Sequence, residues 1–149
     1  LIAMVSRLAM TTIHGANLLT RFIVILLFSS AAYLKVFEPA QLNALGMVFL
    51  DAYNFGFTIG IVFLALHALI LGYLIFKSGY FPRIIGILFV IASLGYLIDS
   101  FSHVLVANYK TGPVYLALPI AIAEIAFPLW LLIKGVNFLE WKKRTSEPA

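Results

Sequence analysis

The sequence predicts an all-α membrane protein, and three observations support this prediction. Hydrophobic residues make up 63% of the 149 positions, charged residues make up 11%, and the mean hydropathy is +1.06. Such a composition leaves too little polar surface for a soluble domain. The apolar residues fall into four segments, each close to the ~20 residues that a helix needs to cross the hydrocarbon core. We therefore expect one transmembrane domain over residues 1–149, with four transmembrane helices in an antiparallel bundle and a short interfacial helix.

The first apolar segment contains the predicted span 12–34. It continues without a Gly-Pro break from about residue 1 to residue 33, which is longer than a span requires and predicts a tilted or projecting helix. Polar residues recur in it at three- and four-residue steps, so they share one stripe that should face protein or water instead of lipid. The members of this stripe are Arg7, Thr11, His14, Asn17 and Arg21.

The second apolar region begins after a polar break. Glu38 precedes Pro39, which is typical of a helix start. Residues 42–49 then suggest a short amphipathic helix lying in the membrane interface before Asp51. The second span is predicted over residues 54–76, and Gly79 just beyond it can adopt the left-handed conformation that ends helices.

The last two spans are predicted over residues 82–106 and 113–136. The third span begins at Pro82, only a tight turn after the second, so these two helices should be antiparallel neighbours. The fourth contains Pro119 and Pro128, which should kink the helix or leave carbonyls for neighbouring groups to satisfy. Residues 140–149 form a basic tail, which we expect in the cytoplasm.

The positive residues predict the orientation, because cytoplasmic flanks collect lysine and arginine. One side of the four-span arrangement carries Arg7, Lys77, Arg83, Lys134, Lys142, Lys143 and Arg144, and the other carries Lys35 and Lys110. Both termini are therefore predicted to be cytoplasmic. The same scattered distribution argues against a nucleic-acid partner. The chain has no cysteine, which excludes disulfides and thiolate metal sites.

Five ionisable residues lie inside the apolar segments, where an unpaired charge is costly and usually marks a functional site. These candidates for a polar intramembrane pocket are Glu124, Asp99, His103, His67 and Arg21. Asp99 and His103 are four residues apart, so an Asp–His hydrogen bond or proton pair is natural on one helix face. The alternative is a polar pair that merely anchors the outer end of the third helix.

Glu124 stands near the middle of the fourth span, with Ala117, Ala121 and Pro128 at helical offsets from it. Small neighbours indicate close contact with another helix. A carboxyl in such a setting should be protonated or paired with Arg21 or a histidine. Pairing with Arg21 is the simpler of these alternatives.

His67 lies in mid-span on the second helix, above the small-residue pair Gly56 and Gly60. A histidine there can bond another helix, relay protons or ligate a macrocycle such as haem. No metal-binding motif is present, so we assign no metal site, no catalytic residue and no cofactor. The topology places His67, Asp99, His103 and Glu124 together near the outer side, with Arg21 nearer the inner half as a partner charge or snorkelling group.

Several segments resemble a known bacterial membrane-protein family of unknown function. They are residues 49–57 (FLDAYNFGF), 66–67 (LH), 71–83 (LGYLIFKSGYFPR), 95–100 (GYLIDS), 118–119 (LP), Glu124, 130–131 (WL) and 133–135 (IKG). The family is the one described as domain of unknown function 4386. Its members usually have six spans, so the resemblance implies that this chain corresponds to the last four and resides in a bacterial inner membrane. The resemblance implies no catalytic residues.

Two functional hypotheses follow from the sequence. The first is a multi-pass membrane protein whose polar pocket supports proton-linked transport, binding or sensing. The second is an accessory subunit of a larger membrane complex, in contact with other membrane subunits and with a pigment, haem or quinone. An enzymatic role is the least supported, because no ligand or catalytic spacing favours it.

Overall fold

The computed structural model describes residues 1–106, 109 and 114–146, and every regular element in this part of the chain is a helix. The elements are α1 (Ile2–Leu27), a 3-10 turn (Ala32–Val36), α2 (Pro39–Ser78), α3 (Arg83–Leu105), α4 (Val114–Ile133) and α5 (Phe138–Ser146). The prediction of an all-α protein is confirmed. At the junction of the third and fourth predicted spans, residues 107–108 and 110–113 lie outside the described residues.

Three helices, α1, α2 and α3, are long and apolar enough to cross a membrane, judged by length and composition. α4 has 20 residues and contains the apolar stretch Ala121–Ile133. These helices identify a membrane protein. The bounds of the four spans within the bilayer stay predictions.

The helix α2 is continuous over 40 residues. The prediction of a separate interfacial helix over residues 42–49 is wrong, because these residues form the first turns of α2. The cap is the one that the sequence indicates: Pro39 takes the first helical position, and the backbone N–H of Glu38 donates to Gln41 Oε1 at 2.9 Å. No proline follows to stop the helix, and the polar side chains of Asp51 and Asn54 are exposed on its surface. At 1.5 Å per residue α2 is about 60 Å long, twice the thickness of a hydrocarbon core.

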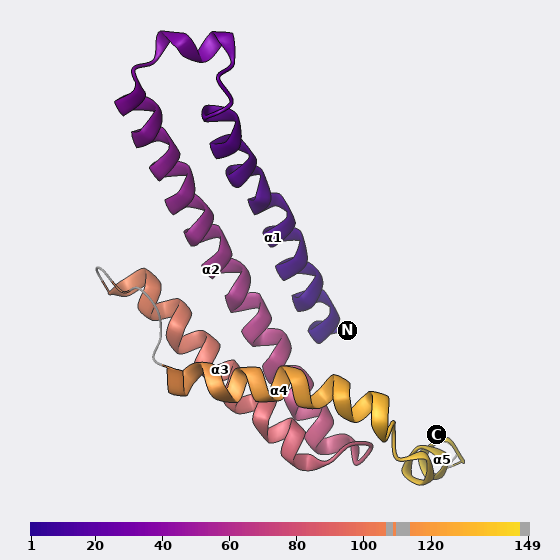
Figure 1. Cartoon of the computed structure of the whole chain (residues 1–149). Coiled ribbons are helices and arrows are strands. Elements are labelled where there is room, and N and C mark those ends of the chain that lie inside the picture. Colours follow the sequence, from indigo (N-terminus) through magenta and orange to yellow (C-terminus); the bar gives the residue numbers. More distant parts are fainter. Residues whose placement is uncertain (107–108, 110–113, 147–149) are drawn as a thin grey trace.

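The helices α2 and α3 form the tight antiparallel hairpin that the sequence predicts (Figure 1). Gly79 ends α2 with φ 70°, and Pro82 is the N-cap of α3. The two helices meet at Gly72 and Gly86, both buried, where a Cβ on either residue would lie within 2.7 Å of the other's carbonyl oxygen. The interface continues into the core of the molecule, formed by Ala68, Ile75, Ile85, Phe89, Ala92 and Ala123.

The helix α1 runs antiparallel to α2 and is displaced along it (Figure 1). It ends at Leu27, earlier than the predicted helix to residue 33, and is followed by Ser30 with φ 59°. Its first turn lies beside the middle of the predicted second span, because the carbonyl of Ala3 contacts His67. At the other end of α1, Phe28 lies against Gly46. α1 therefore begins level with mid-span residues of α2 and not with the hairpin turn.

The helix α4 packs on α3 and crosses it obliquely in the view of Figure 1. Phe127 makes edge contacts with Phe81 and Phe89, with ring centroids 5.4 and 5.7 Å apart. Gly135, with φ 66°, then turns the chain into α5, where Lys143 pairs with Glu140 at 3.7 Å. The basic tail is thus partly a short exposed helix.

Candidate functional site: an interhelical cavity

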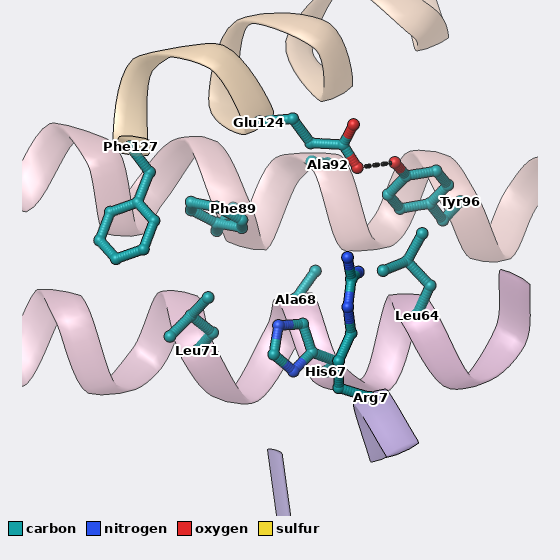
Figure 2. Close-up of a pocket in the computed structure, with 10 residues that line it drawn as sticks. All are labelled: Arg7, Leu64, His67, Ala68, Leu71, Phe89, Ala92, Tyr96, Glu124 and Phe127. Atoms are coloured by element: carbon teal, nitrogen blue, oxygen red, sulfur yellow. Dashed lines mark hydrogen bonds between the residues drawn. The ribbon is translucent and has the colours of Figure 1, made fainter. Parts of the chain in front are cut away.

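A cavity of about 470 Å³ lies where α1, α2, α3 and α4 meet (Figure 2). Each helix contributes one polar side chain to it: Arg7, His67, Tyr96 and Glu124 respectively. The remaining walls are apolar and consist of Leu64, Ala68, Leu71, Phe89, Ala92 and Phe127. A cavity of this size, with apolar walls and a few convergent polar groups, is typical of small-molecule sites.

Glu124 reaches the cavity because α4 packs closely on α3. Ala123, its neighbour in sequence, is fully buried, and Ala92 on α3 is 1% exposed. The small side chains bring the two helices together, and the Tyr96 hydroxyl donates a hydrogen bond to Glu124 Oε1. This bond ties α3 to α4 and orients the carboxyl within the cavity.

Arg7 and Glu124 line the same cavity but are not an ion pair. Within the described part of the chain, the single ion pair is Lys143 with Glu140. Figure 2 shows the Arg7 side chain extending across the cavity from α1 toward the side that carries Tyr96 and Glu124. The site therefore holds a cationic wall and a carboxyl wall with space between them.

His67 is fixed by a bond to the backbone of α1. Its Nδ1 lies 2.8 Å from the carbonyl oxygen of Ala3. A carbonyl can only accept, so Nδ1 donates this bond, and in the neutral tautomer with the proton on Nδ1 the other ring nitrogen, Nε2, is an acceptor. The histidine thus bonds helix to helix, as one of its sequence interpretations proposed, and keeps a lone pair for a further donor.

Asp99 and His103 lie in a different cavity, of about 280 Å³, between α2 and α3. The Tyr109 hydroxyl donates to Asp99 Oδ1 at 2.8 Å, and the Tyr109 ring meets the His103 ring edge-on at 6.1 Å. Ser100 of α3 and Asn54 and Thr58 of α2 complete the polar lining. Both predicted partners contact Tyr109, and the structure gives no bond directly between them.

Arg21 lies away from both cavities. Its guanidinium group stacks 3.9 Å above the ring centroid of Tyr53 on α2. Two other members of the polar stripe also contact α2: Asn17 Nδ2 donates to the Tyr53 carbonyl at 2.7 Å, and His14 Nε2 lies 3.1 Å from the Phe57 carbonyl. This part of the stripe faces protein, as predicted.

The five predicted residues therefore do not share one cavity in the structure. His67 and Glu124 are together, Asp99 and His103 are together, and Arg21 is at the α1–α2 contact. Arg21 is not in contact with Glu124 and lies level with Tyr53, just outside the predicted second span, and Arg7 lines the cavity in its place. The side of the membrane on which each arginine lies stays a prediction.

Sequence reasoning missed Arg7 and Tyr96 as cavity residues. A signal existed for Tyr96, because it is the one tyrosine that the predicted topology places in mid-span, away from the interfacial belts. Within residues 1–106, 109 and 114–146, no group of three or more histidine, aspartate and glutamate residues could hold a metal ion.

The comparisons with known proteins identify a family. Residues 1–135 match the model of the family described as "Domain of unknown function (DUF4386)". A protein of the archaeon Archaeoglobus fulgidus, described as "Uncharacterized protein", is 35% identical over 82 residues, which are 55% of this chain and 48% of that protein. The match thus spans about half the length of that relative. No solved structure matches. Because the family model covers most of the chain, this helical membrane protein belongs to the DUF4386 family.

Proposed function

We propose that this protein binds a small ligand in the cavity between α1, α2, α3 and α4, with Glu124 as the group that links binding or transport to protons. The observation that carries the proposal is the convergence of Arg7, His67, Tyr96 and Glu124 from four different helices. A ligand that touches all four helices biases how they pack, which is what a transporter or a sensor requires.

Exposure supports the presence of a polar occupant. Arg7 and Glu124 line the cavity and are both exposed. Charged groups facing hydrocarbon cost several kcal/mol or more, so intramembrane ionisable residues usually face water, a partner or a substrate. Water or a polar ligand in the cavity removes this cost.

The proton route that we propose follows one face of α3 from this cavity to the second one. Tyr96, Ser100 and His103 follow each other at steps of four and three residues, so they lie on one face of α3. Tyr96 belongs to the larger cavity, and Ser100 and His103 belong to the smaller one. The relay that we propose therefore includes Glu124 and the Asp99 and His103 side chains, as the sequence suggests.

The orientation that we propose places the α2–α3 turn and the C-terminal helix α5 in the cytoplasm of a bacterial cell, with the chain in the inner membrane. The start of α1, level with His67, points to the same side. Lys77 and Arg83 flank this turn and support the assignment by the positive-inside rule. Arg7 no longer contributes to it, because that residue lies in the cavity.

Labelling with dicyclohexylcarbodiimide, a lipid-soluble reagent for protonated carboxyls, tests the proposal. We expect the protein in liposomes to be modified at Glu124, with a rate that rises as the pH falls, because this carboxyl is reached from the membrane and exchanges protons. Peptide mass spectrometry identifies the modified position. The Glu124→Gln variant should lose that adduct, and the Glu140→Gln variant should keep it. If Glu124 were not modified, or if its labelling rate did not change with pH, this carboxyl would be excluded as the proton-linked group.

A second candidate function is an accessory role in a larger membrane complex, in contact with other subunits and with a pigment, haem or quinone. One observation favours it. In the most apolar 18-residue stretch of α1, 6% of the residues are buried, compared with 33% in that of α2 and 39% in that of α3. A helix of another subunit could pack on α1 and cover this apolar surface in place of lipid.

Purification in mild detergent followed by native mass spectrometry separates the two candidate functions. An accessory subunit is expected to leave the membrane with stoichiometric partner chains, and a visible absorption band would accompany a bound pigment or haem. A lone chain or a homo-oligomer without such a band would count against the accessory role and leave the ligand-binding proposal standing.

A further inference from the structure

We infer that the ligand of the larger cavity carries an ammonium group and an anionic group in one small head, joined to an apolar portion. This inference rests on the proposed function, since it names the ligand class of the same cavity. Three properties of the cavity support it: the separation of its charges, the division of its donors and acceptors, and its apolar walls.

The two opposite charges of the cavity are separated. Arg7 and Glu124 lie on different walls of the cavity and are not in ion-pair contact, although their side chains face the same space (Figure 2). A ligand with one positive and one negative group can satisfy both walls at once. A ligand with a single charge pairs with one wall and leaves the charge of the other wall uncompensated, which is costly in a low-dielectric site. The cavity therefore selects a zwitterion over a simple anion or cation.

The hydrogen-bonding groups divide in the same way. Arg7 can only donate, which suits a carboxylate or phosphate. Glu124 can accept through its second carboxylate oxygen, because the Tyr96 hydroxyl bonds to Oε1, and Nε2 of a neutral His67 ring can accept, because Nδ1 donates to the carbonyl of Ala3. A primary ammonium group has three donors and fits two such acceptors.

The rest of the lining is apolar and includes Leu64, Leu71 and the rings of Phe89 and Phe127. These side chains provide a surface for a hydrocarbon portion of the ligand, and the volume of about 470 Å³ accepts a molecule of the size of an amino acid or a lipid head. The required chemistry has two sources: a free amino acid with an apolar side chain, or the head of an ethanolamine phospholipid. Both combine a primary ammonium with an anion.

Protection of Glu124 from the carbodiimide tests the inference. The full chain is placed in phosphatidylcholine liposomes, whose quaternary ammonium has no N–H to donate. L-Leucine is then added, or phosphatidylethanolamine replaces part of the lipid. We expect one of these probes to slow the labelling of Glu124 by about tenfold or more at saturation, as for a well-occupied site. Two analogues serve as matched controls: 4-methylpentanoate lacks the amine of leucine, and 3-methylbutylamine lacks its carboxylate. Neither should protect.

Three variants on α1 test the role of Arg7 and control for effects outside the cavity. Arg7→Gln should abolish protection while keeping the pH-dependent labelling of Glu124, which also shows that the variant is folded and that the probe does not simply consume the reagent. Arg7→Lys, which keeps the charge, should retain part of the protection. Arg21→Gln removes the arginine that stacks on Tyr53 and should leave protection unchanged.

The outcomes separate the inference from the function on which it rests. Protection by leucine identifies a free amino acid, and protection by phosphatidylethanolamine identifies a lipid head. Equal protection by either single-charge analogue, or protection that persists in Arg7→Gln, overturns the zwitterion assignment. Absence of protection by both probes, with pH-dependent labelling intact, overturns it as well and leaves the proposed function in place. Loss of that labelling in the unmodified chain overturns both.

Discussion

The Gly86→Ala variant is expected to lose the close packing of α2 on α3, with a decrease of about 1–3 kcal/mol in the free energy of unfolding. The added Cβ would lie 2.6 Å from the carbonyl oxygen of Gly72 and 2.7 Å from the backbone nitrogen of Phe76. These are backbone atoms of a helix, so no side chain can rotate away and the helices must separate. Titration with sodium dodecyl sulfate, followed by circular dichroism or tryptophan fluorescence, measures the change.

Gly15→Ala is the matched control for this variant. Gly15 also lies within a helix, α1, but apart from Gly15 itself, its two chain neighbours and the adjacent backbone of α1, no heavy atom of the described residues lies within 4 Å of the position of an added Cβ. The same substitution there should be neutral or stabilising, because alanine favours a helix over glycine by up to about 1 kcal/mol. Gly72→Ala should behave like Gly86→Ala, since it meets the carbonyl of Gly86 at 2.7 Å. If Gly86→Ala and Gly15→Ala were equally stable, the close contact between α2 and α3 would be refuted.

Local features of the fold were predictable from the sequence because their causes are local. The start of α2 depends on Glu38 and Pro39, and its end depends on the left-handed conformation of Gly79. The small pair Gly56 and Gly60 predicted a close helix contact, and the structure places Asn17 and His14 of α1 against these two glycines. Each feature follows from the residue itself or from its neighbours within a turn or two.

The axial position of α1 could not be predicted in the same way. Positions 7 and 21 are 14 residues apart, which is about four helical turns or ~21 Å along the axis, so Arg7 and Arg21 share one face. Periodicity does not distinguish which of them faces Glu124. That choice depends on the offset between α1 and α2, which is fixed by long-range contacts such as His67 with Ala3 and Arg21 with Tyr53.

Neither the continuity of α2 nor the separation of the two cavities could be predicted from the local sequence. A polar cluster at Asp51 and Asn54 looks like the end of a span, yet a helix tolerates exposed polar side chains and needs a conformational reason to stop. The sequence also predicted that Glu124 and Asp99 lie together near the outer side. It did not predict which side chains each of them contacts. The Tyr96 hydroxyl donates to the carboxyl of Glu124, and the Tyr109 hydroxyl donates to that of Asp99.

Replacing Glu124 with glutamine is expected to abolish proton-linked flux through the protein. Glutamine has the shape of glutamate and still offers an oxygen to the Tyr96 hydroxyl, so the contact between α3 and α4 is retained. It cannot take up or release a proton, however, and a relay through this position then has no carrier. The flux is measured in proteoliposomes with an inward proton gradient and a trapped pH-sensitive dye. Potassium with valinomycin holds the membrane potential constant.

The flux of the unmodified protein should rise as the external pH falls, and that of Glu124→Gln should drop to the level of empty liposomes. Glu140→Gln is the matched control, because Glu140 pairs with Lys143 on the exposed helix α5. Tyr96→Phe provides a second control: it removes the hydrogen bond but leaves a titratable carboxyl, so a pH dependence should persist. A Glu124→Gln variant with the same pH profile as the unmodified protein would show that protons do not pass through this carboxyl. The cavity would then be a site for binding alone, since the charge separation between Arg7 and Glu124 depends on the carboxylate and not on its exchange of protons.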